Sequence, residues 1–425
     1  MASLLQPIQG MSDITAPEVA HWQRMEAVAR DVMERHGFTE LRTPVMEYED
    51  LFTRSIGDTT DVVQKEMYSF ERSHHRLCLR PEGTAGVMRH AAGLGPIEAA
   101  GGRWYYIGPM FRCERPQAGR KRQFHQCGVE CLEEPSPLVD AEILALQVDL
   151  LRAWGVPDCE VHLNTRGAGA EHAAVAAGLR AALAAREGDL CEDCRRRIHE
   201  NVLRVLDCKN EACRAIVSAL PPVTSFMGPE STAYLEAVEA HLRAMSIPFV
   251  RDPLLVRGLD YYEHTIWEIA GRRAGSQTAL AGGGRYRITL ANRAWAGVGF
   301  AIGMERVLQL LLESPDAASL LPPRRPLVWL VGLGDAAQSA NLALMRPLRA
   351  AGLVCRMAPA GSMKSQMRAA NKAGAAWTLL RGDDELAAGT LLLKNMATGD
   401  QRPVPADDAL PSLLLAETAT AAARP

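Results

Sequence analysis

A proline-rich segment in the second half of the chain constrains its fold more than any other feature. Residues 314–326 read SPDAASLLPPRRP and carry neither helical nor strand periodicity. Proline lacks a backbone N–H and fixes φ, so clustered prolines cannot continue a helix or a central strand. We therefore predict a linker at 316–326 between a large N-terminal part and a small C-terminal part. The length of 425 residues agrees with this division, because one hydrophobic core rarely serves more than about 300 residues.

The sequence after the linker alternates short apolar runs with amphipathic stretches. We assign residues 327–425 to one domain and expect the Ala-rich tail after Pro405 to be frayed. Strands that alternate with helices predict an α/β fold with a mainly parallel sheet. The expected elements are strand 327–332, helix 336–350, strand 353–357, helix 362–373, strand 376–380 and strand 390–395.

The part before the linker mixes helical and strand patterns, and a segment of different texture interrupts it. Residues 166–245 are rich in alanine, arginine and glutamate at helical spacing, which predicts an inserted helical module. The flanking ranges 1–165 and 246–315 then form one α+β domain. Its helices are expected at 17–36, 137–154 and from 304, and its strands at 38–46 (broken by Pro44), 76–80, 104–112, 123–132, 247–270 and 277–302.

Charge and cysteine content limit the partners and the compartment. The net charge is −3, so a nucleic-acid partner would have to be held by local basic patches. No apolar run reaches the ~18 residues of a membrane helix, and the N-terminus has no signal-peptide pattern. We therefore expect a cytoplasmic protein that does not bind membranes. Its ten cysteines are then thiols or metal ligands rather than disulfides.

Two β-like runs joined by an arginine-rich loop form the first candidate site. The runs at 104–112 and 123–132 flank the loop 113–122, which predicts a hairpin. Because strand side chains alternate, one face of the second run carries groups suited to the floor of a ligand site. These residues are Phe124, Gln126, Gly128 and Glu130. The basic residues beside them are Arg112, Arg115, Arg120, Lys121 and Arg122. Guanidinium groups bind phosphate bidentately, although a solvated hairpin tip is the alternative.

Two further features point to a binding site. Arg306 stands in the first turn of an apolar helix, where a positive charge opposes the helix dipole. The run RGLDYY at 257–262 joins two charges to two phenols, which would need polar partners if they were buried. A surface turn is the alternative for 257–262.

These motifs together resemble those of class II aminoacyl-tRNA synthetases. Arg112 with its loop is similar to motif 2, GMER at 303–306 to motif 3, and the helix–strand unit around Pro44 to motif 1, which builds the dimer interface in that class. Three runs resemble the histidyl-tRNA synthetase family in particular. They are RPEGT at 80–84, RQFHQ at 122–126 with Glu130, and RGLDYY at 257–262. The resemblance spans about residues 10–395. It implies an antiparallel sheet core, a C-terminal α/β anticodon-binding domain and a homodimer.

The resemblance also implies an activity and its residues. The chain would activate L-histidine with ATP, with Mg²⁺ on the pyrophosphate, and charge tRNA(His). The implied catalytic residues are Arg257 and Arg112, and the implied ATP-binding residues are Arg112, Glu114, Arg120 and Arg306. The implied histidine-binding residues are Glu82, Gly83, Thr84, Gln126, Glu130, Tyr261 and Tyr262. Glu130 and Tyr262 would each serve one imidazole nitrogen, because discrimination requires a partner for both.

Two departures and three alternatives accompany this assignment. Arg287 stands where the family usually has an acid, and Gln9 where a basic residue is common. One alternative is the regulatory subunit of ATP phosphoribosyltransferase, which typically lacks the C-terminal domain and the RGLDYY pattern. An RNA-binding protein without catalysis is disfavoured by the three arginines of the motifs. A synthetase for another amino acid is disfavoured by the pair Glu130 and Tyr262.

Four cysteines in the helical segment have metal-ligand spacing. Cys191, Cys194, Cys208 and Cys213 read C-x2-C-x13-C-x4-C, which is close to a structural four-thiolate Zn²⁺ site. A small module with little core would be stabilised by such a site. Four reduced thiols on helices are an equal alternative.

Three basic residues in the last domain fall on one helical face. Lys364, Arg368 and Lys372 are spaced four residues apart. The resemblance implies that they contact tRNA phosphates in the anticodon-binding domain. A solvated helical face is the alternative.

Overall fold

The computed structural model describes residues 5–57, 60–116, 119–156, 158–271, 278–314, 325–359 and 361–422. Its contacts divide the chain into two compact units, Met1–Leu321 and Pro322–Pro425. The boundary between them falls inside the proline-rich segment 316–326. Each unit has its own sheet and its own hydrophobic core.

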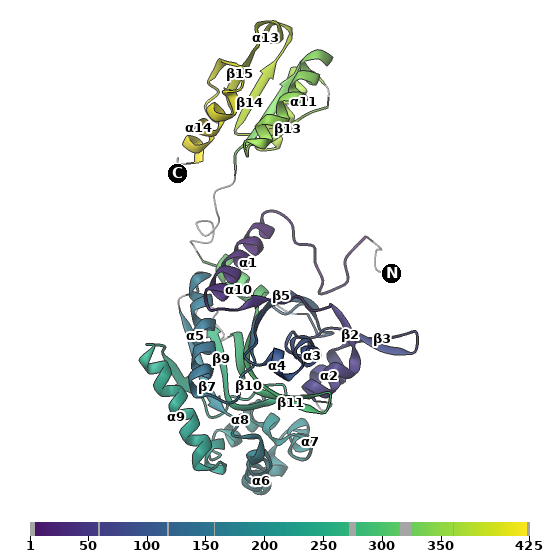
Figure 1. The fold of residues 1–425 in the computed structure, drawn as a ribbon. Coiled ribbons are helices and arrows are strands. Elements are labelled where there is room, and N and C mark those ends of the chain that lie inside the picture. Colours follow the sequence, from purple (N-terminus) through teal and green to yellow (C-terminus); the bar gives the residue numbers. More distant parts are fainter. Residues whose placement is uncertain are drawn as a thin grey trace. The chain divides into compact units, whose positions relative to one another are not determined.

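Eight strands of the described residues form the central sheet of the first unit (Figure 1). Their order is β1-β5-β6-β11-β10-β9-β7-β8. In this order, each pair of neighbouring strands between β5 and β7 is antiparallel. The pairs at the two edges of the sheet, β1 with β5 and β7 with β8, are parallel. The expected α+β core with an antiparallel sheet is therefore confirmed. The strands are β1 Thr39–Glu40, β5 Arg103–Phe111, β6 Gln123–Cys131, β7 Cys159–Thr165, β8 Phe249–Arg251, β9 Tyr262–Gly271, β10 Thr278–Leu290 and β11 Arg293–Gly303.

Helices cover one face of this sheet with an apolar core. Helix α1 packs against α5 (Figure 1), and α9 packs against the other side of α5. Cys127 and Val129 of β6 point into this core, so Gln126 and Glu130 point to the opposite face, as strand alternation predicted. The helices are α1 Glu18–Arg35, α5 Pro137–Ala153, α9 Pro229–Ala244 and α10 Met304–Leu312.

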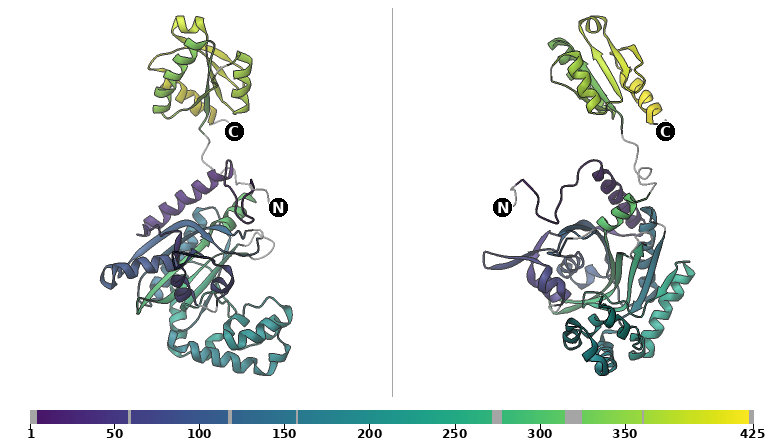
Figure 2. Two further views of the ribbon diagram at one scale, coloured as in Figure 1. Left: turned by 90° about the vertical axis from the view of Figure 1, so that its right-hand side faces the viewer. Right: turned by 180° about the vertical axis from the view of Figure 1, so that it is seen from behind.

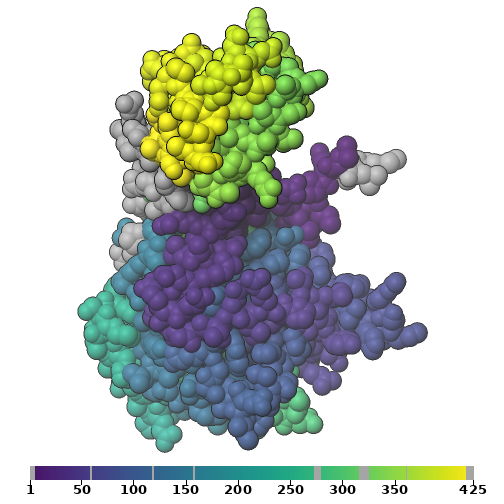
Figure 3. All heavy atoms as spheres, turned by 45° about the horizontal axis from the view of Figure 1, so that its top comes forward, coloured from purple at the N-terminus to yellow at the C-terminus, as the bar shows by residue number. Residues whose placement is uncertain are grey.

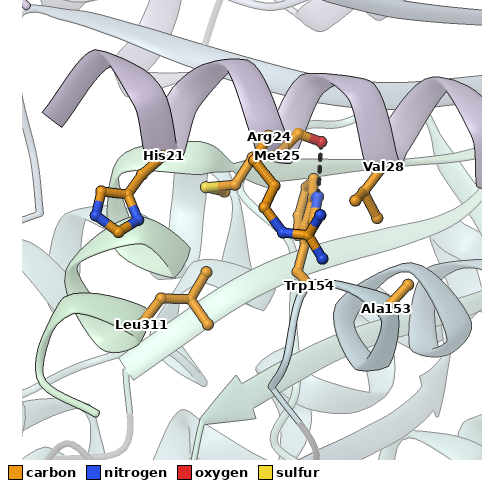
Figure 4. Close-up of a pocket in the computed structure, with 7 residues that line it drawn as sticks. All are labelled: His21, Arg24, Met25, Val28, Ala153, Trp154 and Leu311. Atoms are coloured by element: carbon orange, nitrogen blue, oxygen red, sulfur yellow. Dashed lines mark hydrogen bonds between the residues drawn. The ribbon is translucent and has the colours of Figure 1, made fainter. Parts of the chain in front are cut away.

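The end of α5 is joined to α1 by one buried hydrogen bond. The indole of Trp154 donates to the carbonyl oxygen of Met25 at 2.8 Å (Figure 4). A small pocket beside it lies between α1, the end of α5 and Leu311 of α10. The outer side of α1 is exposed and lies among the purple spheres of Figure 3. Its apolar stripe therefore faces inward, as the helical spacing of 17–36 predicted.

Smaller elements cover the opposite face of the sheet. A second sheet, in the order β2-β4-β3, packs beside α2, which in turn packs against α3. The predicted strand 38–46 is divided at Pro44, because its first piece joins the large sheet as β1 and the chain then enters the small sheet as β2. The elements are β2 Met46–Tyr48, α2 Glu49–Ile56, β3 Tyr68–Arg72, β4 His75–Leu79, α3 Thr84–Leu94 and α4 Pro96–Ala99.

Between β7 and β8 the chain forms helices at one end of the first unit (Figure 2). Residues from Val175 to Val223 build a hydrophobic cluster of their own. The last helix, α9, differs, because Leu235, Val238 and Leu242 belong to the main core. The helices before α9 are α6 His172–Leu183, α7 Glu192–Glu200 and α8 Glu211–Val217, with the short helix η4 Val202–Val205.

The second unit is a five-stranded sheet in the order β13-β12-β14-β15-β16, flanked by helices. The α/β character is confirmed, but the expectation of a mainly parallel sheet is wrong. β12 is parallel to β13 and β14, whereas β14–β15 and β15–β16 are antiparallel. The short helix α13 connects β14 to β15, and a turn connects β15 to β16. The elements are β12 Leu327–Gly332, α11 Asp335–Ala350, β13 Val354–Met357, α12 Met363–Lys372, β14 Trp377–Arg381, α13 Asp383–Ala388, β15 Thr390–Asn395 and β16 Gln401–Pro405.

The expectation of a frayed tail is also wrong for the residues described there. Helix α14 runs over Leu410–Ala422, and Leu410 and Leu414 are buried in the core of the second unit. The two leucines are four residues apart, so they lie on one face and pack together. In the described parts of both units, no helix is long and apolar enough to cross a membrane.

Candidate active site

A cavity of about 270 Å³ lies between the β5–β6 hairpin, the strands β10 and β11 and the start of α10. It brings together motifs that are far apart in the sequence. Its walls contain Arg112, Glu114, Arg120 and Arg306, the residues assigned to ATP, together with Arg257 and Gln126. With Lys121, these four guanidinium groups outnumber the three carboxylates of the lining, so the cavity favours an anion. The three carboxylates are those of Glu114, Glu268 and Glu305.

Backbone carbonyls fix the orientation of two of these arginines. Arg112 donates from Nε to the carbonyl of Pro81 at 2.9 Å, and its guanidinium lies 5.3 Å above the ring centre of Phe124. Arg306 donates from Nε to Gly119 at 3.4 Å and from Nη1 to Ala279. The acceptors in these contacts are neutral carbonyl oxygens. They orient both guanidinium groups without neutralising the positive charge that would attract a ligand.

Glu130 is buried beside this cavity, on the strand face that also carries Gln126, and we call the polar side chains around it the buried pocket. Its Oε1 accepts a 2.7 Å hydrogen bond from the hydroxyl of Thr84. Burial raises the pKa of Glu130 to about 8, and the Thr84 bond opposes this shift. Three buried atoms here, Glu130 Oε2, Gln126 Oε1 and the Tyr106 hydroxyl, have no hydrogen-bond partner among the described residues. Buried polar atoms are nearly always paired in proteins, so this group fits a polar ligand.

Glu82 and Gly83 close the pocket at the start of α3. The Glu82 carboxylate accepts from the backbone N–H of Thr84 at 2.7 Å and of Ala85 at 2.8 Å, which caps the helix. Burial raises the pKa of Glu82. A Cβ atom on Gly83 would lie 2.3 Å from the ring of Tyr106, so this close approach requires glycine.

The RGLDYY run lies immediately before and at the start of β9. Arg257 donates to Glu268 of that strand, with 3.1 Å between Nη1 and Oε2. A Cβ atom on Gly282 would lie 2.4 Å from Nη1 of Arg257, so the glycine of β10 leaves room for the guanidinium over the sheet. The rings of Tyr261 and Tyr262 have centroids 4.8 Å apart, and both are buried. The run is therefore part of the site rather than a surface turn.

Glu305 connects the motif 2 strand to the motif 3 helix. Its two carboxylate oxygens accept from the backbone N–H of His125 at 3.0 and 2.9 Å, and Oε1 lies 3.0 Å from the His125 ring nitrogen Nδ1. The bond crosses 180 residues of sequence and fixes Arg306, the next residue, against the hairpin. The sequence interpretation gave Glu305 no role of its own, and local pattern carries no signal for a contact with a strand 180 residues away.

The two departures from the family pattern have local partners. Arg287 pairs with Glu263 at 3.1 Å and with Glu134 at 3.5 Å, and its backbone N–H donates to Tyr261. The cation is thus held by one carboxylate of β9 and one that follows β6, and the backbone bond to Tyr261 does not depend on the side chain. Gln9 contributes its carbonyl, which accepts from Arg122 at 3.4 Å, a contact that does not depend on the side chain.

Tyr106 was missed by the sequence interpretation. It lies directly opposite Gly128 in the β5–β6 pairing, and residues opposite each other share a face of the sheet. A Cβ atom on Gly128 would lie 2.5 Å from the Tyr106 hydroxyl, so the glycine leaves space for the phenol. An aromatic residue opposite a glycine on the polar face was the available signal.

The four cysteines of the helical segment come together in space. Their sulfur atoms all lie within 4.8 Å of one another, and the Sγ atoms of Cys191 and Cys208 are 3.9 Å apart. The backbone N–H of Cys191 donates to Cys213 at 3.2 Å. The Cys191 thiol has a lowered pKa, chiefly because the backbone N–H of Cys194 faces it. The donor set fits a tetrahedral thiolate centre.

The basic stripe lies in the second unit. Lys364, Arg368 and Lys372 are exposed on α12, whereas Gln366 and Ala370 are buried on its other face. The three cations therefore share a solvent-facing surface, as their spacing predicted.

Comparisons with known proteins agree with this geometry. A profile of the histidyl-tRNA synthetase family matches residues 10–307, and a profile described as an anticodon binding domain matches residues 328–414. The chain is 42% identical over 402 residues to the histidine--tRNA ligase of Anaeromyxobacter dehalogenans, covering 93% of this chain and 96% of that protein. It is 41% identical to the enzyme of that name from Halothermothrix orenii, covering 92% of this chain and 95% of that protein.

A solved structure is similar over nearly the whole length. The apo histidyl-tRNA synthetase of S. aureus superposes with a TM-score of 0.77 at 31% identity, covering 96% of this chain and 99% of that chain. A Bacillus halodurans protein titled as an ATP phosphoribosyltransferase regulatory subunit/histidyl-tRNA synthetase shares the fold, with a TM-score of 0.66 at 18% identity, covering 90% of this chain and 99% of that chain. The antiparallel sheet and its arginine-lined cavity are those of a class II aminoacyl-tRNA synthetase. The chain belongs to the histidyl-tRNA synthetase family.

Proposed function

We propose that this chain activates L-histidine with ATP to give histidyl-adenylate and transfers the histidyl group to the 3′ end of tRNA(His). One observation carries the proposal. Gln126 lies in the wall of the arginine-lined cavity and on the same strand face as Glu130. The site for a polyanion is therefore next to the buried pocket, whose acceptors Gln126 Oε1 and Glu130 Oε2 have no partner among the described residues. An amino acid in the pocket and ATP in the cavity would meet at Gln126 and Arg257.

Recognition of histidine follows from the pocket's donors and acceptors. A neutral imidazole has one N–H donor and one acceptor nitrogen. Glu130 Oε2 has no partner among the described residues, so it would accept from the imidazole N–H. The Tyr262 hydroxyl would donate to the other imidazole nitrogen. The Gln126 carbonyl accepts from the substrate amino group, together with Glu82 and Thr84. Tyr261 and Gly83 shape the walls of the pocket.

Activation transfers an adenylyl group without a covalent enzyme intermediate. The histidine carboxylate attacks the α-phosphorus, an O–P bond forms, and the bond to the leaving pyrophosphate breaks. Negative charge grows on the α-phosphate and the pyrophosphate, so fixed cations stabilise the transition state. Arg112 and Arg257 face the α-phosphate, and Arg306 and Arg120 bind the phosphate tail. Glu114 forms ion pairs with Arg120 at 3.3 Å and Arg112 at 3.9 Å, which orders the loop.

A divalent cation would assist the departing pyrophosphate. Mg²⁺ usually binds substrate phosphates with one or two carboxylates and several waters. Glu114 and Glu268 supply carboxylates to the cavity wall, so the donor set fits a Mg²⁺–ATP complex. In the second step a ribose hydroxyl of the tRNA terminus attacks the histidyl carbonyl, and AMP leaves.

The charging reaction tests this function and separates it from the regulatory-subunit alternative. Purified protein with ATP, Mg²⁺ and tRNA(His) should attach labelled histidine to the tRNA terminus. A tRNA for another amino acid is the control. Well-folded protein that binds histidine but charges no tRNA would contradict the proposal and favour a catalytically inactive relative.

We also propose that the protein is a two-fold homodimer. The motif 1 resemblance at Pro44 points to this region, and apolar side chains on the adjoining small sheet are exposed. They include Met46 at 49%, Tyr48 at 56% and Phe70 at 43%. A self-complementary patch of this kind favours a closed dimer.

The second unit would hold the anticodon arm of tRNA(His). The exposed cations Lys364, Arg368 and Lys372 on α12 support contacts with its phosphates. We expect the enzyme to work in the cytoplasm, where translation uses charged tRNA. The ten cysteines, all among the described residues, form no disulfide, which suits a reducing compartment.

We propose a structural Zn²⁺ at Cys191, Cys194, Cys208 and Cys213. The support is the clustering of the four sulfur atoms within 4.8 Å of one another. A tetrahedral zinc with bonds of about 2.3 Å to sulfur places its ligands at similar separations. Elemental analysis of purified protein should find about one zinc per chain, and a metal-free, fully folded preparation would contradict the proposal.

A further inference from the structure

We propose that the four-cysteine module positions the histidine-site loop 257–262 through Asn201 and Arg204, so that loss of its metal weakens histidine binding. The inference rests on the proposed function, because it concerns how that site is held. Asn201 and Arg204 would act as positioning residues that do not touch substrate. Three structural links support this coupling.

The first link joins the module to the loop. Asn201 donates from Nδ2 to Oδ1 of Asp260 at 3.0 Å, across 59 residues of sequence. Asp260 directly precedes the two phenols that line the histidine pocket. A shift of its carboxylate is therefore transmitted through one peptide unit to Tyr261.

The second link is Arg204, which contacts both the loop and the segment after α2. Its Nη2 lies 3.1 Å from Oδ2 of Asp61, and a Cβ atom on Gly258 would lie 3.0 Å from its Nη1. The guanidinium is thus packed over the glycine of the loop and tied to the segment after α2. The backbone N–H of Asp260 donates to Ile56 at 3.2 Å, which completes the frame.

The third link connects these two residues to the cysteines. Asn201 and the helix η4 lie between Cys194, in the first turn of α7, and Cys208. Arg197 of α7 donates to the carbonyl of Arg204 at 3.4 Å. A metal bound by the four sulfurs would fix both ends of this segment.

These links predict a selective effect on histidine. Loss of the Asn201 bond should disturb the end of the loop that carries the phenols. Arg257, at the other end of the loop, keeps its pair with Glu268 of β9, and the cavity arginines of the hairpin and α10 keep their contacts. The loss of one hydrogen bond to a charged group typically changes affinity roughly tenfold. The KM for histidine should therefore rise by about this factor, and the KM for ATP should change far less.

The experiment compares full-length variants in histidine-dependent ATP–pyrophosphate exchange, with zinc measured in each preparation. Asn201→Ala should raise the histidine KM and retain zinc. Cys208→Ser should raise the histidine KM and lose zinc. Arg186→Ala is the matched control. Arg186 belongs to the same group of helices between β7 and β8, and among the described residues it pairs only with exposed Asp189. The control should behave as the unmodified protein.

A partner exchange separates positioning from general damage. Asn201→Asp alone should be worse than Asn201→Ala, because two carboxylates then face each other. The double variant Asn201→Asp/Asp260→Asn restores a donor and an acceptor and should recover much of the histidine KM. An unchanged histidine KM in Asn201→Ala, or in zinc-free Cys208→Ser, overturns the inference. Absence of exchange in the unmodified protein contradicts the proposed function instead.

Discussion

The hydroxyl of Thr84 donates a 2.7 Å hydrogen bond to the carboxylate of Glu130. Thr84 is the first residue of α3 and Glu130 lies on β6, so the bond joins the helix to the floor of the pocket. It occupies Oε1 and leaves the buried Oε2 without a partner among the residues described. A carboxylate fixed in this way is oriented toward a ligand before the ligand arrives.

Glu130→Gln should mainly raise the KM for histidine. The imidazole is present in the ground state and in the transition state, so a contact made equally in both changes KM more than kcat. The N–H of a bound imidazole would favour the ionised form of Glu130, and loss of a hydrogen bond to a charged group typically costs roughly 10- to 100-fold in binding. Exchange kinetics with histidine and with isosteric analogues measure the effect. A large fall in kcat at unchanged KM would contradict this role for Glu130.

The raised pKa of Glu130 predicts a pH dependence of stability in the ligand-free protein. The carboxyl has a pKa of about 8 when folded and 4.5 ordinarily, so the folded state binds its proton more tightly. Its contribution to the free energy of unfolding is complete below about pH 4.5 and is lost as the pH rises to about 8. Between pH 5 and pH 8 the Tm should therefore fall by a few degrees more in the unmodified protein than in Glu130→Gln. Parallel curves for the two proteins would show that Glu130 is ionised throughout.

Arg257→Ala should lower kcat rather than affinity. In the proposed mechanism Arg257 faces charge that develops on the α-phosphate, and removal of such a donor typically costs on the order of 10²–10³ in kcat. The histidine KM should change much less. Arg152→Ala is a suitable control, because Arg152 is a half-exposed arginine of α5 that pairs with Asp149. If Arg257→Ala raised KM and left kcat intact, Arg257 would be a binding residue only.

Parts of the fold and site were accessible from local sequence pattern. Alternation along 123–132 placed Gln126 and Glu130 on one face, and the structure has this arrangement. Local pattern could not supply contacts such as Arg285 with Asp140, a fully buried ion pair formed across 145 residues. It also misjudged the end of the chain, because the helix around Leu410 and Leu414 is stabilised by packing against the second unit rather than by its own sequence.

The exposed apolar side chains of the small sheet lead us to predict a dimer and a substitution that would disrupt it. Light scattering at micromolar concentration should give twice the chain mass of 46.2 kDa. Phe70→Asp places a charge in the exposed apolar patch and should shift the protein toward monomer. Ile97→Asp is the control, because Ile97 is 90% exposed on α4, outside the small sheet. A monomeric unmodified protein, or equal effects of the two variants, would count against this interface.

Amino-acid-dependent exchange of labelled pyrophosphate into ATP tests the central claim most directly. The assay requires activation alone, so it does not depend on tRNA. Each amino acid is supplied separately at saturating concentration, and Arg257→Ala serves as the inactive control. The account predicts exchange with histidine and none above background with any other amino acid. Clear exchange with a different amino acid, or no exchange from well-folded protein, would contradict it.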